Sequence, residues 1–495
     1  MMKSVALNVP LPRKQLLCAT ALLASSNIDF KLPDCPKIVQ TLVTEVKKCY
    51  PKVSASIILL LILVEIVQAL TTKRIKFKEI DGNVGFPNIY AAIFMPSGFG
   101  KDRILKDLKK LVFKKFREWV YNEFKTFKQR QMLANAKMAN GGDEQEVPRE
   151  MVLEITDGTK EGLFSDAEVL LLFGLGAILF ENSEFGNFIV HPTLDQKQLF
   201  NQLYYGFDNK IISKSTQGKP RKANIEDVPV NVLLSSDPTL FEGNLLKNSF
   251  NTDLKTGLMR RLIIGYQTVK ESYEIERNAK EARIAKKQYS SILKELGKQF
   301  FQIFESIELN SVYELTDKAY DEVLYPYLIK LEELEDEEEN YLLSLEINSR
   351  ELKVIKLATI YACLNHPQEL FINSKDVKQA IDTIEFLSID VRKFLKLEST
   401  LDANCECMFD FFLKNIGKEY TATDLKQSHF KDANLSKREF AKSFEAIIEG
   451  VSLIATSRGY FLNKSIAGNS GFKYSLITLE SEDLDNGASE LENLI

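Results

Sequence analysis

The sequence predicts an α/β fold in which helices cover a parallel β-sheet. Between residues 85 and 268, short apolar segments alternate with stretches of helical periodicity, a pattern typical of strands joined by helical crossovers. A glycine-containing turn follows the first of these segments, and long helical regions flank the alternating part. The strand candidates are Ile89–Met95, Val152–Ile155, Ala177–Phe180, Val230–Leu234 and Leu262–Tyr266.

The length of 495 residues is too great for one core and indicates several units. Five regions are expected. They are a helical N-terminal region (1–84), the α/β core (85–268), a helical lid domain (269–399), a winged-helix-like domain (400–478) and an acidic disordered tail (479–495). The winged-helix prediction depends on three helices, the third ended by Gly450, followed by two strand candidates, Val451–Thr456 and Tyr474–Thr478.

The composition disfavours a membrane, secreted or zinc-binding protein. Hydrophobic residues make up 45% and charged residues 27% of the chain, as in globular proteins. The six cysteines are scattered and lack the spacing of a zinc site, so reduced thiols are expected. The apolar stretch Ile57–Val64 ends at Glu65, too soon for a spanning segment, and is predicted to be a buried helix. A cytoplasmic protein is expected, with no membrane partner.

A phosphate-binding loop, or P-loop, is predicted after the first strand. Such a loop needs a strand to aim it, glycines that let backbone N–H groups surround phosphate oxygens, a lysine and a following helix. Two residues depart from the usual pattern: Met95 replaces a glycine, and Asp102 replaces a Ser or Thr that would hold Mg²⁺. An ordinary strand-to-helix turn is the alternative. The candidate ATP-binding residues are Pro96, Ser97, Gly98, Phe99, Gly100, Lys101, Asp102 and Arg103, with Asp102 also a candidate Mg²⁺ ligand.

Candidate catalytic residues follow the later strands. Glu184 is the expected catalytic acid and second metal ligand, and Glu181 competes with it for this role. Ser236, at the end of the next strand, is the candidate γ-phosphate sensor, although strand ends also carry serine as a turn residue. Arg260 or Arg261 is a candidate arginine finger acting between subunits, with a salt-bridge arginine as the alternative.

The order of these motifs resembles a family of phage and mobile-element P-loop ATPases that occur with primases and are regarded as replicative helicases. The resemblance extends over residues 10 to 398. It rests on FPNIYAAIFMPSGFGKDR, DGTKEGL, AILFENSEFGNF, VNVLLSSDPTLF and GLMRRLIIGY, in that order. It implies a RecA- or AAA-like core that uses ATP and Mg²⁺. Members of that family usually have a Ser or Thr at the position of Asp102 and an Asp at the position of Ser183. The resemblance therefore implies ATP binding more directly than it implies ATP turnover.

Two basic regions are candidates for nucleic-acid binding. The predicted helix from residue 101 to 130 holds eleven Lys or Arg against four acids, and neutralisation of phosphates drives nonspecific binding. Its aromatic residues are spaced for packing, and a solvated basic face is the alternative. In the winged-helix-like domain the candidates are Lys437, Arg438, Lys442, Arg458 and Lys464. Such domains also bind proteins.

The leading hypothesis is an ATP-dependent DNA helicase or translocase in phage or mobile-element replication. It would act as a homo-oligomer, with a hexameric ring as the implied form, on single-stranded or forked DNA. A primase or another replication protein would be a partner, and a phage-encoded protein would lie in the host cytoplasm. The alternative is a DNA-binding replication accessory, a helicase loader or recruiter, with weak or no hydrolysis. A packaging ATPase is a third hypothesis, which no nuclease signature supports.

Overall fold

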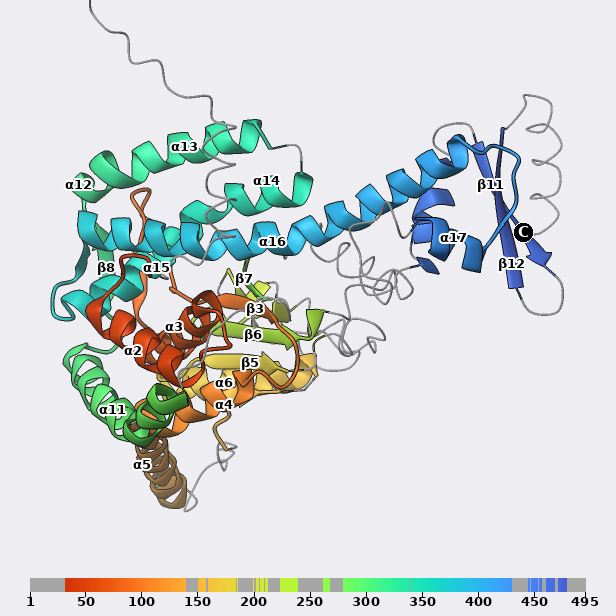
Figure 1. Ribbon diagram of the computed structural model, residues 1–495. Coiled ribbons are helices and arrows are strands. Elements are labelled where there is room, and N and C mark those ends of the chain that lie inside the picture. The colour runs from red at the N-terminus through yellow and green to blue at the C-terminus, as the bar shows by residue number, and fades with distance from the viewer. Residues whose placement is uncertain are drawn as a thin grey trace, which may run out of the picture.

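The computed structural model confirms the predicted α/β class, with a five-stranded parallel sheet among helices (Figure 1). It describes residues 32–138, 150–156, 159–183, 185, 199, 202–203, 205–208, 210–211, 223–238, 261–267, 279–338, 340–429, 444–445, 447–452, 454–455, 460–467 and 471–478. The predicted acidic tail therefore lies outside the described residues, as do positions 1–31.

The central sheet has the strand order β4-β5-β6-β3-β7, and every neighbouring pair is parallel. All five predicted strands are present. Their bounds are β3 Tyr90–Phe94, β4 Glu154–Ile155, β5 Ile178–Asn182, β6 Val230–Ser236 and β7 Leu262–Tyr266. β3 lies between β6 and β7, so the chain leaves β3 toward one edge of the sheet and later returns to its other side.

Alternate residues of each strand face two separate hydrophobic cores, as the pleat requires. Ala91, Ile93 and Leu233 belong to the core that contains α2 (Lys37–Cys49) and α3 (Ala55–Thr72). Tyr90 and Phe94 belong to the other core, which contains residues of α6 (Lys160–Phe173). Because both faces are covered, the strands are buried over most of their length.

Helix α3 is the most apolar element of the described chain. Its length and composition would suit a membrane span, yet all of its residues are buried inside the protein. Ser54 caps its first turn by accepting a hydrogen bond from the Ile57 N–H. The predicted buried helix is therefore confirmed, and it packs against the sheet within the same hydrophobic core.

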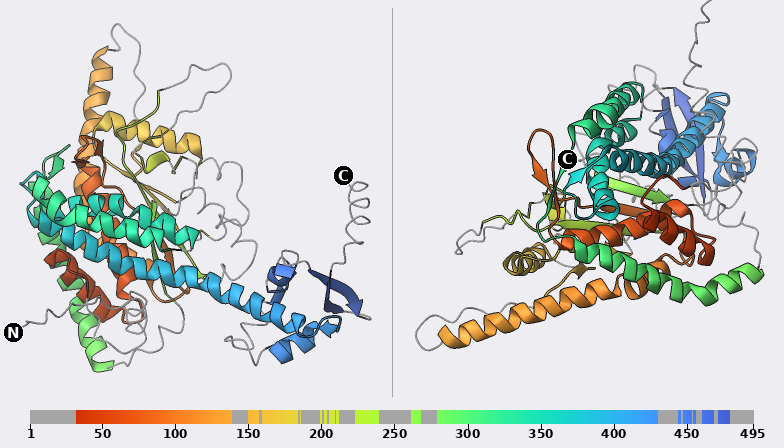
Figure 2. Two further views of the ribbon diagram at one scale, coloured as in Figure 1. Left: turned by 90° about the horizontal axis from the view of Figure 1, so that it is seen from above. Right: turned by 90° about the vertical axis from the view of Figure 1, so that its left-hand side faces the viewer.

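A long helix follows the β3 loop and is built of three segments, α4 (Lys101–Asp107), the π-helical η1 (Leu108–Val112) and α5 (Lys114–Met138). We refer to it as the post-loop helix. It appears in orange in Figure 2 and extends well beyond the sheet in both views. Phe113 and Phe116 pack edge to face on Phe300 and Phe304 of α11 (Ala279–Ser306).

The region after the central sheet is mainly helical, as the sequence predicts. Its helices are α11, α12 Asp317–Ala319, η5 Tyr320–Leu324, α13 Tyr325–Asp336, α14 Tyr341–Asn348, α15 Arg350–Asn365 and α16 Ser374–Leu413. It also contributes β8 (Val312–Leu315) and β9 (Phe371–Ile372) to a second sheet of order β2-β1-β8-β9. That sheet includes β1 (Lys76–Lys78), which lies inside the region 1–84 predicted to be helical and corrects that prediction, and β2 (Val84–Gly85) at the end of the region.

The 40-residue helix α16 joins this helical region to a small C-terminal unit (Figure 1). The boundary expected between residues 399 and 400 therefore lies within one continuous helix. The unit contains a three-stranded antiparallel sheet of order β10-β12-β11. Its elements are β10 Tyr420–Thr421, α17 Ala422–His429, β11 Tyr460–Ala467 and β12 Gly471–Thr478.

The predicted strand Val451–Thr456 is wrong. Residues 447–452 and 454–455 are helical, and the first long strand of the hairpin begins at Tyr460. Gly450 lies inside this helix and does not end it. A Cβ atom at Gly450 would lie 2.4 Å from the Cys405 sulfur of α16, so a close helix contact explains the glycine. The predicted strand Tyr474–Thr478 is present within β12.

Candidate nucleotide-binding site

The predicted P-loop lies at the carboxyl end of the central sheet. It connects β3 to α4, between the carboxyl ends of the neighbouring strands β6 and β7. The chain reverses its direction of strand addition at β3, and in open parallel sheets ligands bind at such points. The loop therefore lies at the switch point of the sheet, which is the place where open parallel sheets bind ligands.

Two glycines give the loop its shape. Gly98 and Gly100 have φ values of 83° and 111°, a region that side chains with a Cβ rarely adopt. Gly100 is also the residue before α4, and a Cβ there would lie 3.1 Å from the ring of Tyr50. Tyr50 in turn donates a hydrogen bond of 2.7 Å to Asp107 of α4. The end of α2 thus supports the loop from behind.

Lys101 reaches back from the start of α4 to the end of β6. Its Nζ donates a hydrogen bond of 2.5 Å to the Ser235 hydroxyl, and Asp102 lies 3.5 Å from it. The Lys101 side chain is 14% exposed, whereas that of Asp102 is 80% exposed. Burial lowers the pKa of Lys101, and the Asp102 carboxylate opposes this shift. The nearest partner of the ammonium is therefore a neutral hydroxyl.

Ser235, and not the predicted sensor Ser236, is the serine that contacts Lys101. Ser235 pairs with Ile93 in the register and Ser236 with Phe94, so the two serines point to opposite faces of the sheet. The Ser236 hydroxyl is buried and has no hydrogen-bond partner among the described residues. Asp237, the next residue, accepts a hydrogen bond of 3.1 Å from the Ser97 N–H and so ties the loop to β6.

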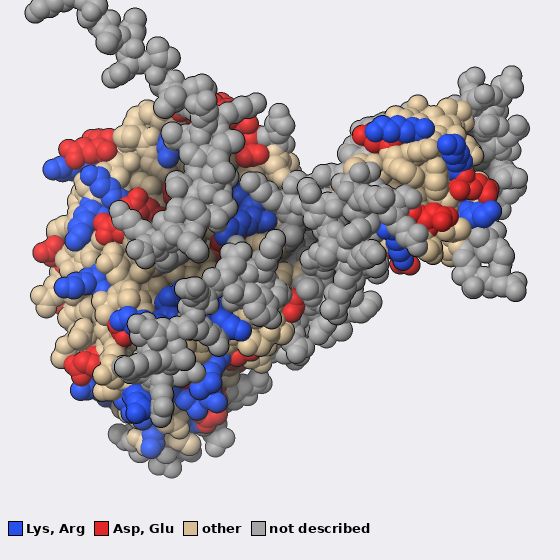
Figure 3. Space-filling view, viewed as in Figure 1, with Lys and Arg blue, Asp and Glu red and all other residues tan. Residues whose placement is uncertain are grey.

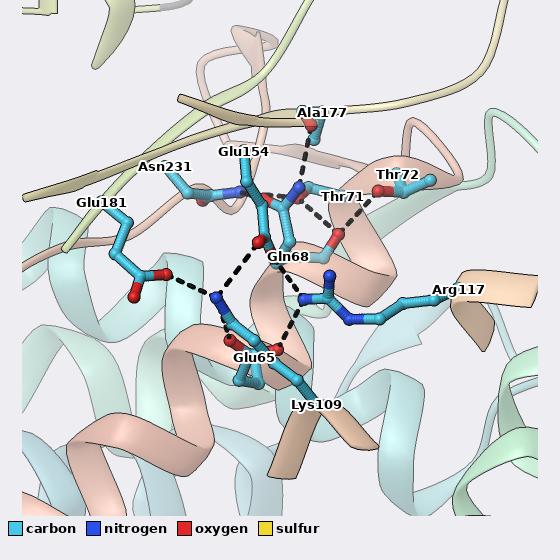
Figure 4. A network of polar contacts seen from close by, with 10 residues as sticks. All are labelled: Glu65, Gln68, Thr71, Thr72, Lys109, Arg117, Glu154, Ala177, Glu181 and Asn231. Carbon is cyan, nitrogen blue, oxygen red and sulfur yellow. Dashed lines mark hydrogen bonds and ion pairs between the residues drawn. The ribbon is translucent and has the colours of Figure 1, made fainter. Parts of the chain in front are cut away.

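A network of charged side chains links the post-loop helix to α3 and the central sheet (Figure 4). Lys109 of η1 is 2.5 Å from Glu181 of β5, 3.2 Å from Glu154 of β4 and 3.8 Å from Glu65 of α3. Arg117 of α5 contacts the same Glu65, at 3.2 Å, and also Glu154. Two cations from the post-loop helix thereby hold three carboxylates from three other elements.

Glu65 is the most buried member of this network. Burial raises its pKa to about 7, while Arg117 and Lys109 act against the shift. For Glu154, the two cations outweigh burial and lower the pKa. Further along α3, uncharged side chains continue the network through hydrogen bonds to the sheet. There Gln68 donates to the Ala177 carbonyl, and Asn231 of β6 donates to Gln68 and Thr71.

An open hollow of about 250 Å³ lies between the start of the post-loop helix and Glu181 of the network. Three lysines and two acids contribute to its lining, so it combines cations that suit phosphate with carboxylates that suit a divalent metal. The lining residues are Asp102, Leu105, Lys106, Lys109, Lys110 and Glu181.

Of the two predicted arginine fingers, Arg261 lies in the described region of the chain, and it is away from the loop. It directly precedes β7, at the amino end of the sheet, and forms an ion pair of 2.7 Å with Asp208. Its position favours the salt-bridge role that the sequence left open. Arg260 lies outside the described residues, as does the predicted catalytic acid Glu184. Glu181, the competing acid, lines the hollow.

Most of the predicted nucleic-acid-binding residues of the C-terminal unit also lie outside the described residues: Lys437, Arg438, Lys442 and Arg458. Lys464 of β11 is described. It is exposed, and its ammonium lies 4.0 Å from the ring centre of Phe472 on the paired strand β12.

Sequence reasoning placed Ser235 beside the sensor candidate and counted Lys109 and Arg117 among the eleven cations of the basic helix. It assigned none of these three, nor Glu154, to the nucleotide site. The available signals were weak, namely a serine at a strand end and two cations at helical spacing. Comparison with known proteins adds no assignment, because the chain matches no protein-family model and shows no significant similarity to a curated protein.

Proposed function

We propose that this protein binds ATP at the β3–α4 loop and hydrolyses it to move along DNA during replication of a phage or mobile element. One observation carries the nucleotide-binding step of the proposal. At the carboxyl end of a parallel sheet, a loop with two glycines at positive φ leads into a helix, and its lysine rests on a neutral hydroxyl of the adjacent strand. This arrangement suits a triphosphate.

The residues present fit the phosphates of ATP. The positive φ values of Gly98 and Gly100 are typical of loops whose backbone N–H groups cradle anions. Lys101 is only partly neutralised by Asp102, so its charge remains for a phosphate oxygen. Ser235 would orient Lys101, and Asp237 would hold the loop through Ser97.

Two of the residues present also fit Mg²⁺. Mg²⁺ needs one or two carboxylates besides phosphate oxygens and water. Asp102, which is exposed, and Glu181 both line the hollow beside the post-loop helix and could supply those ligands. Among the described residues no group of three or more metal-binding side chains occurs, so the phosphates would complete the coordination. The bound ion would neutralise charge on the triphosphate.

The proposals of DNA binding and of an oligomer rest on the motif order and on charge. The motifs resemble those of phage replicative ATPases, and the post-loop helix is strongly basic. Assembly as a homo-oligomer, for which a hexameric ring is the implied form, would place a second subunit beside the loop. The C-terminal unit, with its helices and β10-β12-β11 sheet, is proposed to be a winged-helix-like module that contacts DNA or a replication partner such as a primase.

Lys101→Met tests the nucleotide site. Wild-type protein should bind a fluorescent ATP analogue and hydrolyse ATP faster with single-stranded DNA, whereas Lys101→Met should lose at least about ten-fold in affinity or turnover. Lys298→Met, at an exposed lysine of α11, is the matched control. Wild-type protein that shows no affinity for the analogue would refute the proposed function.

A second candidate function is nucleotide binding without hydrolysis, in a helicase loader or recruiter. Two observations favour it: Asp102 stands where a hydroxyl is usual, and Glu181 is held by Lys109 at 2.5 Å. This candidate predicts analogue binding without turnover, and DNA binding and oligomers that survive Lys101→Met. Parallel measurement of turnover and native mass separates the two functions.

A further inference from the structure

Most of the cations on the post-loop helix are exposed and do not pair with buried groups of the protein. Of its eleven Lys and Arg between residues 101 and 130, four are partly buried and have partners inside the protein. Lys101 contacts Ser235, Lys109 and Arg117 hold the three carboxylates, and Lys128 pairs with Glu150. The remaining seven are exposed. The exposed cations are Arg103, Lys106, Lys110, Lys114, Lys115, Lys125 and Arg130.

Five of these cations follow one another along a single face of the helix. Successive members of this face are three or four residues apart, the spacing that aligns side chains on a helix. We call this face the basic stripe. It consists of Arg103, Lys106, Lys110, Lys114, Glu118, Tyr121 and Lys125, all of them exposed. Glu118 is its only acid and lies 3.5 Å from Lys114.

Tyr121 is the exposed aromatic residue of the stripe. Its exposed fraction is 61%, whereas Phe113, Phe116 and Phe124 of the same helix are buried. The prediction that aromatic residues of this helix serve packing is thus confirmed for those three, and Tyr121 differs from them. Within the stripe, Glu118 precedes Tyr121 and Lys125 follows it, so the exposed ring offers a flat apolar surface beside a cation.

The stripe is accessible along a projecting element. The orange helix in Figure 2 leaves the body of the protein, and its far end lies clear of the sheet. In Figure 3, blue Lys and Arg side chains gather over the lower end of the body, where Figure 1 places α4, α5 and α11. From Arg103 to Lys125 the stripe extends roughly 33 Å at the rise of an α-helix.

We propose that the basic stripe binds single-stranded nucleic acid, with Lys114 and Lys125 contacting phosphates and Tyr121 stacking on a base. Clustered cations select a polyanion, and the exposed ring selects one whose bases are unpaired, because duplex bases are already stacked. The inference rests on the proposed function for the role of DNA binding. It adds the surface of the protein to which the nucleic acid binds. It requires neither ATP binding nor hydrolysis.

The test measures fluorescence anisotropy of labelled single-stranded (dT)20 and of a duplex of the same length, without nucleotide, over a range of salt concentrations. Tyr121→Ala should weaken (dT)20 binding by about five-fold or more, the loss expected for one stacked base. Lys114→Gln/Lys125→Gln should lower the slope of log Kd against log salt concentration by about 1.4, for two phosphate contacts on a single strand.

The matched controls are exposed residues that lie far from the basic stripe in the sequence. Tyr341→Ala removes a tyrosine of similar exposure, 59%, and Lys318→Gln/Lys330→Gln removes two exposed lysines. Both should leave binding unchanged. Circular dichroism melts confirm that each variant folds.

Three outcomes would overturn the inference: no binding of (dT)20 by the wild type, equal binding by Tyr121→Ala and Tyr341→Ala, or competition by polyglutamate as effective as that by unlabelled (dT)20. The last result would indicate an acidic polypeptide as the occupant. Analogue binding by the same samples separates the two proposals. Wild-type protein that binds the analogue but not (dT)20 would refute the stripe alone, and wild-type protein that binds (dT)20 but not the analogue would refute the nucleotide site alone.

Discussion

Lys109→Met tests whether the charged network that links the post-loop helix to α3 and the central sheet stabilises the fold. The substitution keeps the length of the side chain and removes the cation that contacts all three carboxylates. Arg117 would remain in contact with Glu65 and Glu154, while Glu181 would lose its ion pair with Lys109.

The expected loss follows from distance and exposure. Charges about 4 Å apart attract by about 4 kcal/mol at an effective dielectric constant of about 20, and desolvation offsets some of this attraction. Glu181 and Glu154 are 21% and 30% exposed, so water screens them partly after the change. We therefore expect a loss of about 2–3 kcal/mol, below the ~3–5 kcal/mol found for fully buried pairs.

The assay is thermal unfolding of full-length protein. A loss of this size corresponds to a fall in Tm of several degrees, at roughly 2 °C per kcal/mol for a large domain. Lys110→Met is the matched control, because this neighbouring lysine is exposed, and its Tm should change little. Glu181→Gln alone and combined with Lys109→Met completes a double-mutant cycle, with an expected coupling of about 1 kcal/mol or more.

Two results would refute this reasoning. One is a Tm of Lys109→Met equal to that of Lys110→Met. The other is strict additivity of Lys109→Met and Glu181→Gln, which would mean that the two charges do not interact in solution.

The remaining predictions concern the loop and the buried carboxylate. Ser235→Ala should weaken binding of an ATP analogue several-fold more than Ser236→Ala does, because Ser235 is the serine that holds Lys101; equal effects would contradict the assigned contact. Gly100→Ala should lower stability by about 1–3 kcal/mol and weaken analogue binding, because φ is 111° and the new Cβ would lie only 3.1 Å from the Tyr50 ring. Gly82→Ala, where φ is 89° but no atom lies within 4 Å, is its control and should leave analogue binding unchanged. Glu65 has a folded-state pKa of about 7, above the unfolded value, so the unfolded state releases its proton first as pH rises. Stability from this group should therefore fall between about pH 5 and 7, by up to about 3 kcal/mol, and Glu65→Gln should flatten the Tm profile over that range. A steeper profile in Glu65→Gln would be inconsistent with this pKa.

The sequence was a good guide to the central sheet, because strand signals are local. Leu262–Tyr266 was predicted with the bounds that the structure has, and the other four strands differ by a few residues at most at either end. Apolar runs of β-branched and aromatic residues mark a strand whose two faces are both buried. The same reasoning failed at Val451–Thr456. There, Val451 and Ala455 lie on a helix and belong to the same hydrophobic core as Phe409 of α16, and tertiary packing outweighed β-propensity.

Some features of the candidate site were also accessible from sequence. The glycines and Lys101 follow a strand at a spacing that fits a phosphate loop. The choice between Ser235 and Ser236 was not accessible, because neighbouring strand residues point to opposite faces and only the register decides which face meets the loop.

By itself, the sequence determined the parallel α/β core, the buried character of α3, and the loop in which Gly98, Gly100 and Lys101 lie. Each of these follows from residue preferences and periodicities that act within one element. Only the tertiary structure brought Glu65, Lys109 and Glu181 together and left Tyr121 exposed on the post-loop helix. The physical reason is that charges and exposed faces acquire partners through the packing of elements far apart in the chain.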